Sequence, residues 1–435
     1  MRGNWSHRLI LLSFCLFMCF GCAKTQQPSN TVTIWHWMTD RHNALTQLAA
    51  KYEQETGIKI KFELYAPSEA YSQKIIAAAQ ARVLPDIYGV LGEKKIFASF
   101  IENGYVADLT EEYEKNSGEW KSSLFPKALA ASTFEASNTY NIKPGTYGVP
   151  IDVTNIQMVY NINLLKKVGV EKAPTNFDEF LKAIDALNKN GVAGLVSGWG
   201  EMWMIDCFAS NYAFNIMGEA KIMATYRGEV PYTDPDWIKL FNVFKTLTDR
   251  KAFMEGIVIK GNKYAEQDFA LERAAFGFNG SWCVNVYNDM NPNLEYGAML
   301  PPSVNPALPM KIWGGAGSSF VVNNSSPQKG EAIKFLKWLT AKDQQVFLTE
   351  QTHNLPSSRL ALPAIPKVLS QFASAMDSTT HPTVWERTEQ SRVIEAFNKA
   401  IQSIIIGEKT PEQVAQEVQK VKENELEQEK KRQNR

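Results

Sequence analysis

The stretch Trp313-Gly314-Gly315-Ala316-Gly317-Ser318-Ser319-Phe320-Val321-Val322 joins an aromatic residue, a flexible run and the start of an apolar strand. Glycine reaches backbone angles that are closed to other residues, so the run from Gly314 to Gly317 can redirect the chain. Phe320, Val321 and Val322 suit a buried strand. We interpret the stretch as a crossing between two lobes. The alternative is a glycine-rich turn inside one domain, a common kind of loop.

The length of the chain favours the crossing. Its 435 residues exceed the roughly 250 to 300 residues at which a single hydrophobic core stops growing, so two lobes are expected. The 46 Lys and Arg residues balance the 46 Asp and Glu residues. This balance gives no reason to expect a nucleic acid or a polybasic contact with a membrane.

The N-terminal segment is typical of a secretory signal peptide. Arg2, His7 and Arg8 precede an apolar run over residues 9–20. The run is shorter than the roughly 20 residues of a membrane-spanning helix. We therefore interpret residues 1–21 as a signal peptide that is removed.

The end of this segment resembles a bacterial lipoprotein signal. Gly21 directly precedes Cys22, which in such signals is lipidated and becomes the mature N-terminus, although Cys19 stands where leucine is usual. The polar residues 22–30 would then form a lipid-anchored tether. Of five cysteines, only Cys207 and Cys283 would remain available, and their spacing leaves open whether they pair or stay as buried thiols.

Strand and helix patterns alternate from residue 31 to residue 90. Strands are predicted over 31–37, 58–64 and 85–90, and helices over 45–52 and 70–82. This order indicates a doubly wound α/β sheet. Ligands of such sheets bind at the carboxyl ends of the strands, which places Trp37 and Asp86 at the edge of a cleft.

Several segments resemble family 1 extracellular solute-binding proteins, the maltose-binding-protein-like receptors of ABC importers. The similarity covers nearly all of residues 31–425. It is carried by Thr33-Ile34-Trp35-His36-Trp37, residues 52–60, 71–79 and 85–87, Tyr147-Gly148-Val149-Pro150, residues 160–169 and 174–180, and Gly280-Ser281-Trp282.

The resemblance implies an α/β, two-lobed periplasmic-binding-protein fold of the type II kind. Each lobe would be a sheet flanked by helices, and the chain would cross between lobes about three times, near 150, 315 and 364. Lobe one would comprise residues 31–149 and 317–362, and lobe two residues 152–312 and 366–425. The charged residues 426–435 have almost no apolar members and are expected to fray.

The tryptophans are the candidate ligand-binding residues. An aromatic ring matches the apolar face of a sugar, while carboxylates and amides take its hydroxyls. In sugar-binding relatives the tryptophan of the Gly-Ser-Trp segment stacks on a ring, and that role is carried to Trp282. Core packing is the default for any one tryptophan. The other candidates lie beside glycine or at a strand end, and they are Trp37, Trp199, Trp203, Trp313 and Gly314. Asp86 and Asp152 are the candidate polar partners.

Catalytic and metal sites find less support. The five His residues are far apart and lack metal-ligand spacing, and no P-loop follows Gly314 to Gly317. Paired carboxylates could make a glycosidase, and Glu201, Asp206, Asp152 and Glu386 are available. With 46 acidic residues, however, chance pairs are expected.

The sequence thus predicts a monomeric solute receptor of the bacterial cell envelope, with no enzymatic activity, metal or cofactor. It would be held by lipid at the outer face of the cytoplasmic membrane or in the periplasm, bind a mono- or oligosaccharide by hinge closure, and deliver it to an ABC permease. Two alternatives stay open. One is a binder of glycerol-3-phosphate or another small polar solute, which needs Arg, Lys or Ser in the cleft. The other is a glycosidase or a structural surface lipoprotein.

Overall fold

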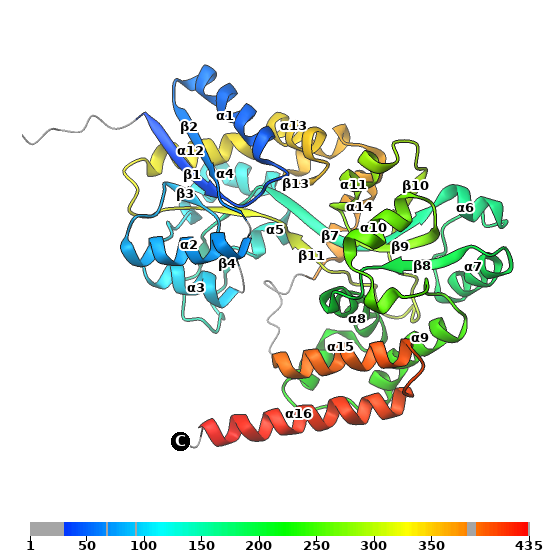
Figure 1. Ribbon diagram of the computed structural model, residues 1–435. Helices are drawn as coiled ribbons and strands as arrows, with labels where there is room; N and C mark the ends of the chain where they lie inside the picture. The colour runs from blue at the N-terminus through cyan, green and yellow to red at the C-terminus, as the bar shows by residue number, and fades with distance from the viewer. Residues whose placement is uncertain (1–29, 67, 92–93, 381–388, 434–435) are drawn as a thin grey trace, which may run out of the picture.

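The computed structural model describes residues 30–433, apart from residue 67 and the segments 92–93 and 381–388. The predicted signal peptide, Cys22, most of the tether, and Glu386 lie outside the described residues. Figure 1 shows two lobes, each a sheet flanked by helices. The predicted two-lobed α/β fold is therefore confirmed.

The first lobe contains a sheet with the strand order β2-β1-β3-β12-β6. β1 is parallel to β2 and β3, whereas β12 is antiparallel to β3 and β6. The alternation of residues in β1 divides its side chains between two faces, so that Val32 and Ile34 are fully buried. The strands are β1 (Thr31–His36), β2 (Lys59–Leu64), β3 (Ile87–Tyr88), β6 (Val149–Pro150) and β12 (Ser319–Val322).

Helices cover both faces of this sheet. One apolar core joins the sheet to α1 (His42–Thr56) and α12 (Lys329–Leu339), and another joins it to α2 (Ser68–Ala81) and α3 (Lys94–Glu102). The lobe is completed by α4 (Thr110–Ser123), α5 (Pro126–Ala130), α13 (Lys342–Thr352) and a hairpin of β4 (Thr133–Phe134) and β5 (Gly145–Thr146).

The second lobe is built on the strand order β10-β7-β9-β8. β9 is fully buried along its length and is parallel to β8 but antiparallel to β7. The strands are β7 (Asp152–Asn161), β8 (Ala193–Ser197), β9 (Ala274–Gly280) and β10 (Tyr296–Met299).

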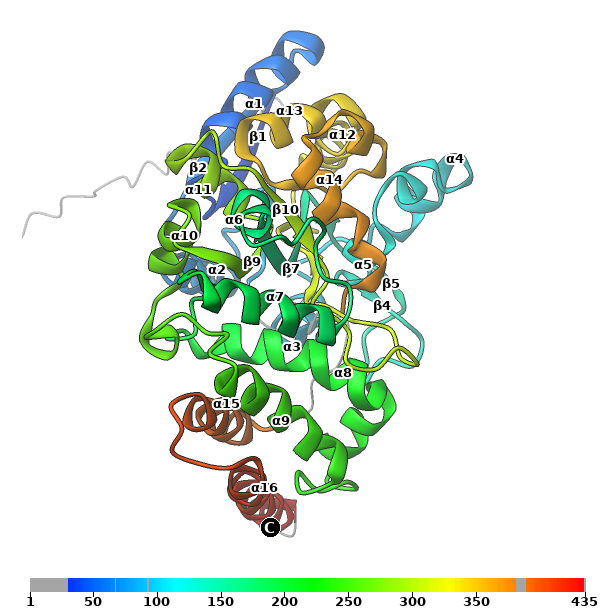
Figure 2. The ribbon, with the colours of Figure 1, turned by 90° about the vertical axis from the view of Figure 1, so that its right-hand side faces the viewer.

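The helices of the second lobe again lie on both faces of its sheet. The larger core contains α7 (Phe177–Lys189) and α8 (Met202–Tyr226), and the smaller one contains α10 (Asn262–Ala270), α11 (Cys283–Met290) and α14 (Lys367–Ser374). An outer layer below α8 holds α9 (Pro235–Asp249), α15 (Ser391–Ile405) and α16 (Pro411–Gln433), as Figure 2 shows. Short elements of this lobe are α6 (Ile162–Lys167), η1 (Ile257–Ile259) and η3 (Met376–Ser378), and η2 (Arg359–Ala364) follows β13.

The segments that join the lobes lie side by side on β7. Its first residues pair with β11 (Gly314–Ala316) and β13 (Leu355–Pro356), and its remaining residues pair with β9 and β10. β11 therefore belongs to the second lobe, whereas β12, separated from it by two residues, belongs to the first. The glycine-rich stretch thus runs from a strand paired with β7 to a strand paired with β3, and Phe320, Val321 and Val322 are buried.

The sequence predicts that the charged C-terminal segment frays, but in the structure α16 continues as a helix as far as Gln433. Leu426 packs against Gly228, and Arg392 pairs with Glu425 at 3.2 Å. Earlier in α16, the buried Lys422 ammonium lies 2.8 Å from the buried Glu389 carboxylate. These contacts hold the helix on lobe two.

Candidate functional site

In each lobe, a central strand ends on the side of the crossing segments. In lobe one, β12 begins at Ser319, directly after the crossing, and runs antiparallel to β3, so the carboxyl end of β3 lies on the crossing side. In lobe two, Gly280 at the carboxyl end of β9 pairs with Ile156, near the start of β7. Side chains that follow these strands therefore border the space between the lobes.

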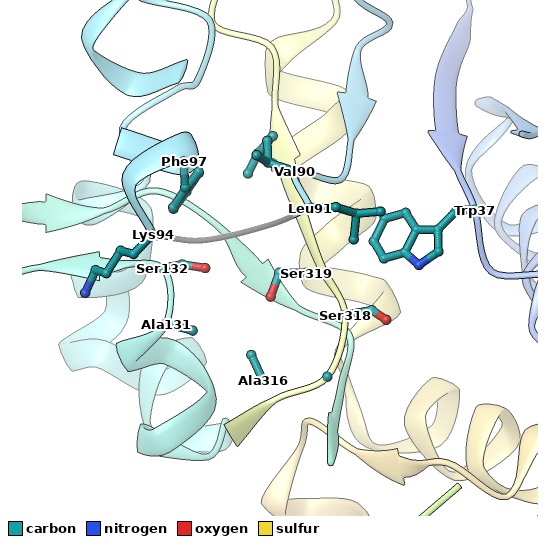
Figure 3. A pocket seen from close by; sticks show the side chains of 12 residues that line it. Trp37, Val90, Leu91, Lys94, Phe97, Ala131, Ser132, Ala316, Ser318 and Ser319 are labelled. Atoms are coloured by element: carbon teal, nitrogen blue, oxygen red, sulfur yellow. The ribbon is translucent and has the colours of Figure 1, made fainter. Parts of the chain in front are cut away.

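Lobe one carries a cavity of about 170 Å³ at this edge (Figure 3). In Figure 3 the hydroxyls of Ser132 and Ser319 lie between Lys94 and Phe97 on one side and Leu91 and Trp37 on the other. The lining residues are Trp37, Val90, Leu91, Lys94, Phe97, Ala131, Ser132, Ala316, Gly317, Ser318, Ser319 and Val321.

Trp37 is held in place by its neighbours. Its ring lies on the backbone of Gly89, where an added Cβ would come within 2.2 Å of the indole, so only glycine fits there. The Tyr71 ring packs on Trp37 at a centroid distance of 5.2 Å, and the Tyr71 hydroxyl accepts a hydrogen bond from the Gly89 amide at 2.9 Å. The half-buried Trp37 thus offers a fixed aromatic face, where the sequence predicted a ligand-binding residue.

Lys94 is the charged residue among the described lining residues, and in Figure 3 its ammonium points away from Ser132 and Ser319. Its ammonium donates to the Thr133 carbonyl at 3.0 Å and lies 4.9 Å from the centre of the Phe134 ring. Ser132 and Ser318 are buried and add hydroxyl groups. Lys94 and these serines were not among the residues predicted from the sequence, because no local pattern distinguishes them from other lysines and serines of the chain.

Lobe two presents a pair of tryptophans at its own carboxyl edge. Trp282 follows β9, and its ring covers Gly280 so closely that an added Cβ would lie 1.9 Å from it. The centroids of the Trp203 and Trp282 rings are 6.2 Å apart. Trp203 is 44% exposed. An exposed indole beside a half-buried one is a surface able to stack on a ligand ring.

Glu201 fixes the orientation of Trp203. One carboxylate oxygen accepts from the Trp203 indole at 3.2 Å, and the other accepts from the Asn262 amide at the start of α10 at 2.7 Å. One acidic residue thus ties the exposed tryptophan to the next helix.

Trp313 and Gly314 occupy the crossing. The half-buried Trp313 donates from its indole to Ser210 at 2.6 Å and packs against the larger core of lobe two. Gly314 is buried, and an added Cβ would lie 2.6 Å from Asn155 and from Thr379. Gly314 therefore permits the close approach of β11 to β7, which is a packing role.

The structure corrects the role predicted for Trp199. Its side chain is fully buried and packs against Phe208, Phe244 and Phe253 at centroid distances of 5.1 to 6.1 Å. Because a stacking residue must expose one face of its ring, Trp199 belongs to the core of lobe two.

Asp86 also has a packing role. It precedes β3, at the amino end of that strand and opposite the edge that bears the cavity. Its carboxylate accepts from the Thr33 amide and hydroxyl, both at 2.8 Å, and from the Ser326 hydroxyl at 2.6 Å. These bonds tie β1 to the start of α12 within lobe one.

Asp152 lies at the crossing itself. Its carboxylate accepts from the Ser318 amide at 2.8 Å and forms an ion pair with Arg41 at 3.0 Å. Burial raises the pKa of Asp152, and the Arg41 guanidinium opposes that rise. A buried carboxylate with these partners joins crossing segments and is not presented to a ligand hydroxyl.

Cys207 and Cys283 are buried and do not form a disulfide. Burial raises the pKa of the Cys283 thiol. Within the described part of the chain, no group of three or more His, Cys, Asp or Glu residues could hold a metal ion. No helix of the same residues is long and apolar enough to cross a membrane.

The sequence matches a known protein family. The family described as bacterial extracellular solute-binding protein matches residues 47–372. This chain belongs to that family. Solute-binding proteins of this family are substrate-binding proteins and not enzymes, so the glycosidase alternative is set aside, and the family is extracytoplasmic.

Individual relatives are distant but cover most of the chain. The melibiose/raffinose/stachyose-binding protein of Bacillus subtilis is 23% identical over 373 residues, which is 80% of each chain. A structure from a study of xylan utilisation by Caldanaerobius polysaccharolyticus has a TM-score of 0.68 and 20% identity, covering 90% of this chain and 99% of that one. A Bacillus licheniformis sugar transporter with stachyose has a TM-score of 0.64 and 20% identity, covering 90% and 98%.

Proposed function

We propose that this chain is the solute receptor of an ABC importer that captures a carbohydrate between its lobes and delivers it to the permease. The observation that carries the proposal is the placement of tryptophans at the carboxyl edges of both sheets. Trp37 contributes from lobe one, and Trp203 and Trp282 contribute from lobe two. Relatives named for raffinose and stachyose binding support a sugar as the ligand.

The mechanism proposed is closure about the crossing segments. Lobe one would comprise residues 31–149 and 317–362, and lobe two residues 152–312 and 366–425. A ligand that contacts both lobes favours the closed state by its differential affinity for that state. The chain would act as a monomer, held at the outer face of the cytoplasmic membrane by lipid on Cys22.

A binder of a small anionic solute such as glycerol-3-phosphate is the second candidate. It is favoured by Lys94 and the serines that line the lobe-one cavity. The described lining contains no carboxylate, although residues 92–93, next to it in sequence, lie outside the described set.

Native mass spectrometry followed by calorimetric titration separates the two candidates. The ligands to be tested are the melibiose, raffinose and stachyose series, xylo-, chito- and malto-oligosaccharides, and glycerol-3-phosphate. We expect a neutral sugar to bind with micromolar or tighter affinity. Binding of glycerol-3-phosphate with no sugar bound would replace the proposed function with the second candidate.

A further inference from the structure

Glu266 is a buried acidic residue outside the ligand site described above. It lies in α10, and its side chain is completely removed from solvent. A carboxylate that is taken out of water is costly unless its oxygens are bonded. The groups that bond to Glu266 therefore show what this residue holds in place.

One oxygen of Glu266 joins α10 to β9, which pack against each other (Figure 1). This oxygen, Oε1, accepts from the Asn262 side-chain amide at 2.9 Å and from the Asn279 side-chain amide at 3.2 Å. Both asparagines are buried. The other oxygen, Oε2, lies 3.0 Å from the ammonium of Lys263, whose side chain is 76% exposed. The two asparagine bonds are therefore internal, and the lysine pair lies at the surface.

The Asn262 bond leads to Trp203. Asn262 is the first residue of α10, so its backbone amide is one of those that the helix leaves without a partner of its own. This amide donates to Glu201 at 2.7 Å, and the other Glu201 oxygen accepts from the Trp203 indole at 3.2 Å. By fixing the Asn262 side chain, Glu266 fixes the first residue of the helix and, through it, the carboxylate that orients Trp203.

The Asn279 bond leads to Trp282. The side-chain oxygen of Asn279 accepts from the Gly280 amide at 2.8 Å. The Trp282 ring lies directly on Gly280, where an added Cβ would come within 1.9 Å of the indole. Glu266 thus fixes the side chain that holds the Gly280 backbone, and that backbone is the surface that the indole covers.

We propose that Glu266 is a positioning residue of the ligand site, which fixes Trp203 and Trp282 through Asn262 and Asn279, an inference that rests on the carbohydrate function proposed above. It acts through its two asparagine partners and without contact to the ligand. Side chains that are fixed before binding lose less conformational entropy when the ligand binds. Loss of the Glu266 bonds should therefore weaken binding without removing any contact to the sugar.

Fluorine NMR of the full mature chain labelled with 5-fluorotryptophan tests the positioning directly, because it needs no ligand. Trp203→Phe and Trp282→Phe identify the two resonances. We expect Glu266→Ala to shift and broaden both of them. Lys263→Met is the matched control, because it removes the ion pair but keeps the asparagine bonds, and it should leave both resonances unchanged.

The two asparagines allow each connection to be broken by itself. Asn262→Ala removes the bond that leads to Trp203 and should perturb that resonance more than the other. Asn279→Ala removes the bond that leads to Trp282 and should do the reverse. These variants also carry the test if Glu266→Ala does not fold.

Calorimetric titration with the sugar that binds the wild type most tightly measures the effect on binding. Glu266→Ala should lower the affinity about tenfold. Glu266→Gln keeps an oxygen for the two asparagines and should retain near-wild-type affinity. Leu187→Ala controls for lost stability, because Leu187 is fully buried in the larger core of lobe two whereas α10 packs in the smaller one, and it should keep its affinity.

Unchanged tryptophan resonances in Glu266→Ala, or a loss of affinity no larger than that of Leu187→Ala, would overturn the positioning role. An equal loss in Glu266→Gln would also overturn it, because the charge and not the asparagine bonds would then be responsible. Failure of every sugar to bind the wild type would instead contradict the carbohydrate function, and the fluorine resonances would still decide whether Glu266 positions the tryptophans.

Discussion

The Arg41 guanidinium lies 3.0 Å from the Asp152 carboxylate and connects the start of α1 to the first crossing segment. The same side chain donates to Ser318 at 2.7 Å and to Asn354 at 2.9 Å. Ser318 belongs to the second crossing, and Asn354 directly precedes β13. A single arginine therefore bonds to the crossing segments near residues 150 and 315 and to the residue that precedes β13.

Arg41→Met should lower the free energy of unfolding by about 3 kcal/mol, because Asp152 would remain as a buried charge without its partner. The double variant Arg41→Met/Asp152→Asn should lose less, since it removes the charge as well. Urea unfolding of the two single variants and the double variant measures the coupling. Additive losses in the double variant would show that the ion pair contributes nothing to stability.

Local sequence predicted the strand over residues 31–37 and so placed Trp37 at a carboxyl edge. Trp203 was selected from its glycine-containing segment, and Trp282 through the resemblance of Gly280-Ser281-Trp282 to the solute-binding family. Trp199 and Trp203 share one glycine-containing segment, yet one is fully buried and the other is 44% exposed. Which of them faces outward depends on the packing of α8 against distant helices, and the local sequence does not contain that information.

The roles of the acidic residues could not be predicted from local sequence either. Asp86 and Asp152 were selected by their position near strand ends and a crossing. Their hydrogen-bond partners lie 53, 240 and 166 residues away in the chain, at Thr33, Ser326 and Ser318. Only the folded structure shows that these partners occupy the carboxylates.

The buried His36 predicts a loss of stability in acid. Burial, and after it the neighbouring His42, lowers the pKa of His36 to about 4. The unfolded chain, with a pKa near 6.5, takes up the proton first as pH falls. Stability is therefore complete above about pH 6.5 and is lost as pH falls toward about 4, by about 2 kcal/mol between about pH 7.5 and about pH 5.

Urea unfolding at both pH values measures this loss in the wild type and in His36→Gln. The variant lacks the buried imidazole of residue 36, so its stability should fall less over the same interval. An identical pH dependence in the two proteins would show that other groups are responsible.

The proposed lipid attachment at Cys22 predicts membrane association. A diacylglyceryl group brings two acyl chains, which anchor stably where a single chain is marginal. Cys22→Ala should therefore move the protein from the membrane fraction to the soluble fraction when expressed in a bacterial host. Cys283→Ala is the matched control and should stay with the membranes, because Cys283 is a buried thiol of lobe two. Membrane association of both variants would contradict lipidation.

Closure about the crossing segments predicts a smaller radius of gyration with ligand bound. Small-angle scattering with and without a saturating sugar measures it, and far-ultraviolet circular dichroism should stay unchanged because the lobes move as units. A radius that is the same at saturation would contradict lobe closure. Arg41→Met offers a second comparison, since loss of its three contacts should alter the unliganded radius more than the liganded one.

The half-buried Trp282 and the fully buried Trp199 give the sharpest test of how the ligand is held. Trp282→Ala should weaken sugar binding by 2 kcal/mol or more, roughly thirtyfold, as the removal of a central aromatic anchor commonly does. Trp199→Ala should instead lower the free energy of unfolding by about 3–5 kcal/mol, because it empties a fully buried site, while the protein that remains folded keeps near-native affinity. Calorimetric titration beside a thermal melt of each variant separates the effects. Should Trp282→Ala lose stability and keep its affinity, Trp282 would join Trp199 in the core, and the ligand would have to be held by Trp37 and Trp203.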